Sequence, residues 1–306
     1  RAYQKVLEGH PNQPESRERV AFLLGICGQR WESVPHLMNL IATGRWDLQT
    51  LAVLTDVERP IEQYELVDQA FRAEPGDRMV RLSVASHAFL SGDMQEARRI
   101  LEEILEDHPD WTPSHAMLGE VLFQQNALED LVKWNSNLPA EAENSPTIWY
   151  VRGQTARALE RLDASAQFYA RAITLAPEYR QATYQLGQVL AKLQDNNSSI
   201  LLENANWQAQ ISQNLDLILA SDGKARDSMR IVSQGCYHLG RFSEARAWAL
   251  TSQSIHGKQD WTSEILEKTD QANLVDETRT QPSFLKQRNF VLGYASIASR
   301  DLFHEL

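Results

Sequence analysis

Residues that could catalyse a reaction or bind a metal are scattered through this sequence and match no known catalytic spacing. His10 and His108 each precede a proline in an expected turn. No histidine has a partner three or four residues away that would make a metal-binding pair on a helix. The motif H-E-x-x-H is absent, because Phe303, His304 and Glu305 lead only to the end of the chain. The motifs G-x-x-x-x-G-K-[ST], G-x-G-x-x-G and G-x-S-x-G are also missing, so the sequence predicts no enzyme, no cofactor and no metal site.

Acidic side chains are numerous, but their spacing favours a solvated helix face over a catalytic pair. In one expected helix the acidic residues are Glu102, Glu103, Glu106 and Asp107, and the apolar residues are Ile100, Leu101, Ile104 and Leu105. The two sets fall on opposite faces of a helix, as in any amphipathic surface helix. We therefore single out no catalytic carboxylate pair.

The composition is that of a folded chain without a nucleic-acid or membrane role. Hydrophobic residues make up 42% of the 306 residues and charged residues 23%, which is ordinary for a globular protein. The chain has 30 Lys and Arg against 41 Asp and Glu, a net charge of −11, and no basic stripe offsets it locally. Because phosphate backbones require clustered cations, nucleic acid is not an expected partner. No apolar run approaches the roughly 20 residues that span a bilayer, so we expect no membrane insertion.

The cysteines and the first residues bear on the cellular context. Cys27 and Cys236 lie too far apart along a repeat array for one disulfide, and we expect both to be core thiols. The chain begins at Arg1 without Met, and residues 1–11 read as the second half of a repeat. This suggests a piece of a longer protein, cytoplasmic or periplasmic, whose oligomeric state stays open. The mixture of Gln, Trp and acidic residues with few Cys suits a bacterial protein.

A period of 34 residues runs through the middle of the sequence. Gly119, Gly153 and Gly187 are successive 34-residue steps, and Pro109 stands two periods before Pro177. The clearest unit is the stretch from Pro146 to Glu178. In this unit the pattern residues are Trp149, Gly153, Ser165, Tyr169, Ala172 and Pro177. This unit resembles a tetratricopeptide repeat, a helix-turn-helix unit of 34 residues, and it departs from the usual pattern at Arg152 and Ala156.

The resemblance implies an all-α fold, a right-handed α-α superhelix (TPR solenoid) of about seven to eight helix pairs with a C-terminal capping helix. Residues 1–253 form the expected solenoid, with repeats near 1–13 (partial), 14–43, 44–77, 78–111, 112–145, 146–179, 180–225 and 226–253. The unit 180–225 carries an insertion of about 12 residues over the usual period. Residues 254–282 read as a polar connector, and residues 283–306 as a C-terminal capping or linker helix.

Local signals place some helix ends. Gly92 suits a left-handed C-cap, and Asp93 beside it suits the N-cap of the next helix. Pro35 is expected in the first turn of its helix, where a missing N–H leaves no bond unmade. Within the insertion, residues 195–199 read as a loop and residues 200–220 as an elongated helix.

The resemblance also implies where a ligand would bind, because the first helix of each repeat lines the inner groove in this family. The inner positions of three successive units carry Tyr, Gln and cationic side chains. These candidate groove residues are Tyr150, Gln154, Arg157, Gln181, Tyr184, Gln188, Lys192, Arg230, Gln234 and Tyr237. One interpretation is a polar groove for an acidic or extended peptide, in which aromatics give contact area and cations hold a carboxylate. The other is that the tyrosines fill the space between helices while the Gln side chains are solvated.

The inner positions nearer the N-terminus are apolar instead. They are Met79, Leu82, Phe89, Leu90, Ala116 and Phe123. Exposed together they would form an apolar patch suited to an amphipathic helix or to the chain's own tail. Packing against a divergent neighbouring unit is the alternative.

The sequence favours a protein-interaction scaffold or adaptor that binds a protein or peptide partner in the concave groove. The Lys and Asn carboxylate clamp of relatives that hold chaperone C-termini is not reproduced, since Gln and Tyr stand at most of those positions. The alternative is a regulatory or assembly module excised from a larger multi-domain enzyme or secreted protein. An intrinsic hydrolase ranks third.

Overall fold

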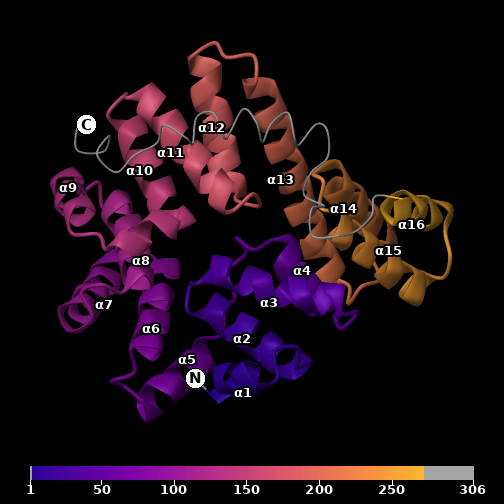
Figure 1. Cartoon of the computed structure of the whole chain (residues 1–306), viewed down its shortest axis with the longest axis horizontal. Coiled ribbons are helices and arrows are strands. Elements are labelled where there is room, and N and C mark those ends of the chain that lie inside the picture. The colour runs from indigo at the N-terminus through magenta and orange to yellow at the C-terminus, as the bar shows by residue number, and fades with distance from the viewer. Residues whose placement is uncertain (1, 272–306) are drawn as a thin grey trace. The chain divides into compact units, whose positions relative to one another are not determined.

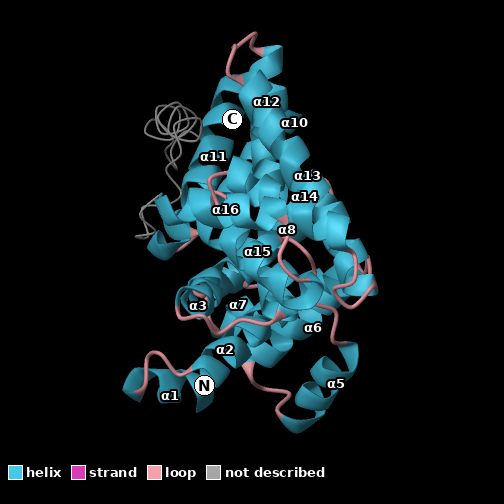
Figure 2. Ribbon diagram, turned by 90° about the vertical axis from the view of Figure 1, so that its right-hand side faces the viewer, coloured by secondary structure: helices cyan, strands magenta, loops and turns pink. Residues whose placement is uncertain are grey.

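The computed structural model describes residues 2–271, and every regular element in this range is helical (Figures 1 and 2). The early helices are α1 (Ala2–Gly9), α2 (Pro14–Ile26), α3 (Arg30–Ala42), α4 (Leu48–Thr55), α5 (Tyr64–Ala73), α6 (Arg78–Leu90) and α7 (Met94–Asp107). The middle helices are α8 (Thr112–Gln124), α9 (Leu128–Ser136), the short 3-10 helix η1 (Ala140–Asn144), α10 (Pro146–Ala158) and α11 (Leu162–Leu175). The later helices are α12 (Arg180–Lys192), α13 (Ser198–Ala220), α14 (Arg226–His238), α15 (Phe242–His256) and α16 (Asp260–Gln271).

Every regular element within residues 2–271 is helical, which confirms the all-α fold. Seven successive pairs run from α2 and α3 to α14 and α15, one pair for each expected unit between residues 14 and 253. The insertion in the unit 180–225 is helical and lengthens α13 to 23 residues.

Small residues at the repeat positions allow the two helices of a pair to approach closely. A Cβ on Gly153 of α10 would lie 2.6 Å from the ring of Tyr169 in α11. In the same pair the Ser165 hydroxyl donates to the carbonyl oxygen of Gly153 at 2.9 Å. Gly119 of α8 faces the indole of Trp134 in the same way. The regular spacing of these glycines therefore reflects rings packed directly on a helix backbone.

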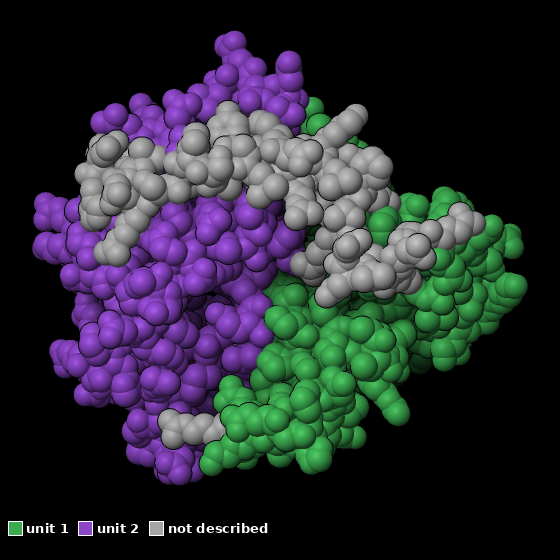
Figure 3. Space-filling view, in the orientation of Figure 1, with its two compact units in different colours: residues 1–21, 33–59, 199–290 green, residues 22–32, 60–198, 291–306 purple. Residues whose placement is uncertain are grey.

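The described residues fall into two compact units, coloured separately in Figure 3. Unit 1 contains residues 2–21, 33–59 and 199–271, and unit 2 contains residues 22–32 and 60–198. Each unit is therefore built from segments that are distant in the sequence. This departs from a simple solenoid, in which each repeat contacts only its neighbours.

In unit 1 the early helices α3 and α4 share a core with α13, α14 and α15. Arg241, at the start of α15, donates to the carbonyl oxygens of Leu54 and Thr55 at 3.0 Å. These two carbonyls belong to the last turn of α4, where no intrahelical donor remains for them. Arg241 also pairs with Glu244 at 2.7 Å, and both side chains are buried. Trp248 completes the contact by donating from Nε1 to the Thr55 hydroxyl at 2.9 Å.

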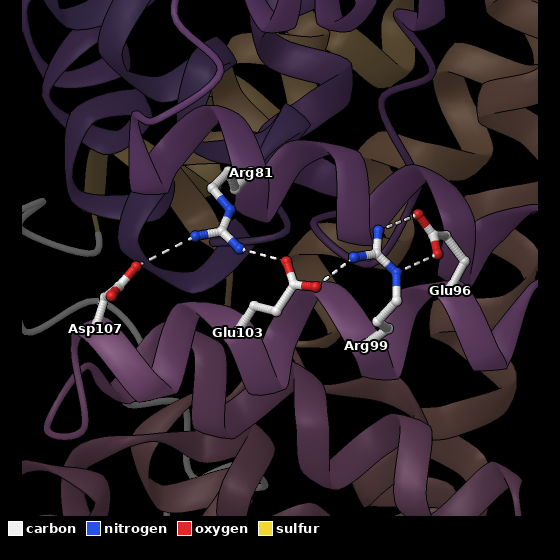
Figure 4. A network of polar contacts seen from close by, with 5 residues as sticks. All are labelled: Arg81, Glu96, Arg99, Glu103 and Asp107. Carbon is white, nitrogen blue, oxygen red and sulfur yellow. Dashed lines mark hydrogen bonds and ion pairs between the residues drawn. The ribbon is translucent and has the colours of Figure 1, made fainter.

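Unit 2 holds the regular repeats. Its core is made by the facing sides of α6 to α10, with Leu82, Leu101, Val121 and Leu131 fully buried. On the outer side of α6 and α7 lies a polar network, drawn in Figure 4. In this network Arg81 pairs with Glu103 at 2.8 Å. The acidic face of α7 is thus a solvated and paired surface, as the sequence indicated.

Several local predictions can be compared with the structure. Gly92 has φ +84° and Asp93 caps α7 by accepting from the Glu96 amide at 3.0 Å, so both predictions are confirmed. Pro35 is a correction: α3 already begins at Arg30, which places Pro35 inside the helix. Because proline has no N–H, the carbonyl of Trp31 loses its helical donor at this point.

The region after the last repeat also differs from the expectation. Residues 254–282 were expected to form a polar connector, but α15 continues to His256 and α16 occupies Asp260–Gln271. Thr262 and Thr269 on α16 are fully buried, and Ile265 is nearly so. A buried face explains how a polar segment forms a packed helix. The expected capping or linker helix at residues 283–306 lies outside the described residues.

Candidate peptide-binding surfaces

The predicted groove residues lie on the first helices of three repeats, α10, α12 and α14. Tyr150 and Gln154 on α10 correspond by one 34-residue period to Tyr184 and Gln188 on α12. Residues one period apart occupy equivalent places on stacked helices. The structure divides the set, because α10 and α12 belong to unit 2 and α14 belongs to unit 1.

Tyr150 packs inside unit 2. Its side chain is 5% exposed, and its ring lies 4.8 Å from the ring of Tyr179 and 5.6 Å from that of Tyr169. Its hydroxyl accepts from Gln154 Nε2 at 3.2 Å. In this structure Tyr150 therefore fills the space between helices, which is the second of the two interpretations of the sequence.

Arg157, at the end of α10, connects this helix to its neighbour. Its guanidinium donates to the side-chain oxygen of Gln185 on α12. The side chains of Gln154 and Arg157 are both half-buried. Of the two, Arg157 contacts α12, whereas Gln154 donates to Tyr150 on its own helix.

We call the stripe formed by Gln181, Tyr184, Gln188 and Lys192 the α12 row. These residues recur every three or four positions, so they share one face of the helix. Tyr184 is 48% exposed, which is high for an aromatic side chain. Gln181 and Lys192 are exposed, and Gln188 is half-buried. The row thus combines an accessible aromatic ring, amides that can bond a peptide backbone and one cation.

The remaining predicted residues lie on α14 in unit 1. Arg230 and Gln234 are exposed, and Arg230 lies 3.6 Å from Asp227 one turn earlier. Tyr237 packs against the core of unit 1, with its ring 5.1 Å from Phe242 and 5.6 Å from the ammonium of Lys268. Arg230 and Gln234 stay predictions as ligand contacts, while Tyr237 joins helices within its unit.

The inner positions of α6, α8 and α10 are contacted by a short segment of the same chain, Cys27–Trp31, which we call the inner segment. The Cys27 thiol lies 3.5 Å from the carbonyl oxygen of Met79, and Gln29 Nε2 lies 3.3 Å from the Met79 sulfur. Arg30 pairs with Glu120 at 3.2 Å. Among the apolar positions near the N-terminus, Met79 is therefore packed against this segment, whereas Leu90 stays 43% exposed.

Trp31 brings an aromatic side chain to the same surface. Its Nε1 donates to the hydroxyl of Thr147, in the first turn of α10, at 3.2 Å. Its ring lies 4.6 Å from the ring of Tyr179, which in turn contacts Tyr150. This contact could not be found from the sequence, because 116 residues separate Trp31 from Thr147 and the period carries no information about such pairs.

Glu120 is the acidic residue of α8 that the inner segment contacts. Its side chain is 18% exposed, and burial raises the pKa of its carboxyl while the nearby Arg30 opposes the rise. The same burial that disfavours a lone carboxylate strengthens its pairing with a cation. This position therefore selects a positively charged partner.

The described residues contain no group of three or more His, Cys, Asp or Glu that is placed to hold a metal ion. Within residues 2–271 no helix has the length and apolar character to cross a membrane. Both cysteines of the chain are buried and unpaired by disulfides.

Comparison with solved structures returns helical repeat proteins. The APC/C hetero-tetramer Cut9–Hcn1 matches with a TM-score of 0.45 and 13% identity, covering 88% of this chain and 58% of that one. TTC0263, a thermophilic TPR protein from Thermus thermophilus, matches with a TM-score of 0.37 and 16% identity over 64% and 98% of the two chains. YrrB, a TPR protein with an unusual peptide-binding site, matches with a TM-score of 0.35 and 14% identity over 67% and 100%.

A curated relative matches part of the sequence. Over 120 residues, 38% of this chain, the sequence is 25% identical to the mouse (Mus musculus) protein O-mannosyl-transferase TMTC1. The matched region is 13% of that protein. The chain thus corresponds to a small part of the relative's length.

The tetratricopeptide repeat family model matches residues 146–179, the unit formed by α10 and α11. These are the residues in which Gly153, Ser165 and Tyr169 make the close helix contact described above. Residues 146–179 therefore form a tetratricopeptide repeat.

Proposed function

We propose that this chain is a protein-interaction scaffold that binds an extended, carboxylate-bearing peptide along the α12 row. Tetratricopeptide repeats are typical of protein-interaction scaffolds. A peptide that crosses α12 would stack on Tyr184 and bond its backbone to Gln181 and Gln188. Lys192 would hold an acidic side chain of the peptide.

The observation that carries the proposal is the exposure of Tyr184. The equivalent ring one repeat earlier, Tyr150, is buried by its neighbours, whereas 48% of Tyr184 is accessible. Accessible tyrosines among polar side chains are favoured anchors, because they offer a large contact area at a small loss of side-chain entropy.

Selection of peptides from a phage-displayed random library on the full chain, followed by affinity measurement, tests the proposal. Tyr184→Ala should weaken the selected peptide at least about tenfold, which corresponds to ~1.4 kcal/mol. The matched control is Tyr3→Ala, because Tyr3 is also exposed, at 42%, but lies on α1 in unit 1. The control should change the affinity less than about twofold.

Lys192 tests the charge of the ligand separately. Lys192→Ala should weaken a peptide that carries Glu or Asp and leave its Gln or Asn analogue unaffected. Equal affinity of the wild type and Tyr184→Ala for every selected peptide would exclude the α12 row as the binding surface.

A second candidate function is that of a regulatory or assembly module within a longer protein. It is favoured by the relative above, in which the matching region is 13% of a protein named as a transferase. The complete reading frame tests this candidate. Flanking domains with catalytic motifs would support it, and a start codon just upstream of Arg1 would oppose it.

A further inference from the structure

The residues that contact the inner segment recur with the period of the repeats. Met79 on α6 and Thr147 on α10 stand two periods apart, and Ser86 and Glu120 stand one period apart. Gly28 lies against Ser86 and Met117, since a Cβ on Gly28 would come 3.4 Å from the Ser86 oxygen and 2.6 Å from the Met117 methyl. The inner segment therefore contacts three first helices, and two of the contacted positions recur from one helix to another, as positions lining the site of a peptide ligand would in a repeat array.

At its C-terminal end the inner segment makes polar side-chain contacts with specific partners. Arg30 and Trp31 are adjacent, and each reaches a different helix: Arg30 pairs with Glu120 on α8 and Trp31 donates to Thr147 on α10. Both side chains stay half-buried. An ion pair beside an aromatic contact discriminates between sequences, whereas apolar packing alone would accept many side chains.

The backbone of the inner segment is partly non-helical. The residues between Ile26, where α2 ends, and Arg30, where α3 begins, form a turn in which Gly28 has φ +73°. This turn belongs to unit 2, while residues 2–21 and 33–59 on either side belong to unit 1. The inner segment therefore belongs to unit 2, although the chain on both sides of it belongs to unit 1.

We propose that the inner face of α6, α8 and α10 is a second recognition surface, specific for a peptide in which Arg directly precedes Trp, and that the inner segment occupies it when no partner is bound. This goes beyond the α12 row and does not depend on it. An occupant tethered in the same chain acts at an effective concentration on the order of millimolar, so a partner must displace it. The partner is therefore a segment that presents the same Arg-Trp pair with further contacts.

Release of the inner segment by mutation tests the proposal. The probe is a fluorescein-labelled peptide with the sequence of residues 23–34 and Ser in place of Cys27, and the protein is the full chain. The double substitution Arg30→Ala with Trp31→Ala should raise the affinity for the probe at least tenfold over the wild type, because the internal competitor is weakened. A probe with Ala in place of Trp should not show this gain.

The helix side of the contact gives the specificity control. Adding Glu120→Lys to the double variant should reverse the gain, since the new ammonium repels the probe's Arg. Glu106→Lys is the matched control, because it makes the same change of charge at an exposed position of α7, a helix that supplies none of the contacts described for the inner segment, and it should leave the gain intact. Binding of the probe that is the same in wild type and in the folded double variant overturns the proposal.

The double variant could unfold, and the wild-type chain could dimerise; each result has its own consequence for the proposal. If circular dichroism shows that the double variant is unfolded, Arg30→Ala alone replaces it, with an expected gain of at least threefold, and no gain overturns the proposal. A wild-type chain that dimerises, and loses its dimer with Trp31→Ala, would assign the surface to residues 22–32 of a second copy and overturn the proposal of a foreign peptide. Neither outcome depends on Tyr184, so the α12 row is tested separately.

Discussion

Arg241 donates to the carbonyl oxygen of Thr55 at 3.0 Å, although 186 residues separate the two in the sequence. The guanidinium donates hydrogen bonds to the last carbonyl oxygens of α4 and also forms an ion pair with the buried Glu244. Further polar contacts join the same segments, including Trp46 with Thr251 at 3.2 Å and Ser212 with Asp56 at 2.6 Å. Unit 1 therefore depends on pairing between early and late helices, in contrast to a linear array.

Arg241→Met should strongly destabilise unit 1. The substitution leaves the Glu244 carboxylate buried without its cation and removes the donors from the last carbonyls of α4, which costs about 3–5 kcal/mol. The free energy of unfolding in urea measures the effect. Arg246→Met on the same helix is the control, since the partner of Arg246, Asp270, is 63% exposed and the pair is worth about 1 kcal/mol or less. Equal losses in the two variants would contradict the capping role of Arg241.

Gly153→Ala should weaken the central repeat. A Cβ at this position would come within 2.6 Å of the Tyr169 ring, and that ring is fully buried and has no room to move. We expect a loss of about 1–3 kcal/mol from overpacking, seen as a lower melting temperature. Gly76→Ala is the matched control, because nothing lies within 4 Å of the added Cβ. An unchanged melting temperature for Gly153→Ala would mean that α10 and α11 are not packed this closely.

Glu120 should contribute to the pH dependence of stability. Burial raises the pKa of its carboxyl in the folded state above the unfolded value, so the folded state favours the protonated form. The stabilisation that the protonated Glu120 carboxyl gives to the folded state is fully present below the unfolded pKa. It is lost as the pH rises through the folded pKa. Melting temperatures of the wild type and Glu120→Gln should therefore diverge as the pH rises over this window. A difference that is constant with pH would show that the carboxyl is not perturbed by folding.

The two thiols should be unreactive in the folded chain. Burial raises the pKa of both Cys27 and Cys236 to about 12, so almost no thiolate is present at pH 8. A chromogenic disulfide reagent should label neither cysteine within minutes in native buffer and both in denaturant. Rapid labelling of the native chain would contradict their burial.

The sequence predicted the elements whose signals are local. The spacing of Gly119 and Gly153 indicated first helices, because each glycine is required by the ring that packs on it within the same repeat. Asp93 identified its own helix start, since an N-cap is decided by residues within one turn. The sequence also placed the residues of the α12 row on one helix, because they share the register of the repeat, while their role in binding stays a prediction.

Contacts between distant segments could not be predicted in this way. Pro35 was misplaced because α3 begins early, at Arg30, where the first turn makes contacts with residues 90 and 116 positions away. Tyr150 and Tyr184 are equivalent in the repeat pattern, yet one is buried and the other exposed. The rings of Tyr169 and Tyr179 pack on Tyr150, and Tyr179 also contacts Trp31, a residue that no period relates to it.

Hydrogen exchange read by mass spectrometry shows directly whether a peptide binds at the α12 row. The full chain is compared with and without a saturating selected peptide, with residues 242–256 as the internal reference. A peptide bound along the α12 row should slow exchange in residues 180–192 and leave the reference helix unchanged. Protection confined to segments other than residues 180–192 would contradict binding at the α12 row.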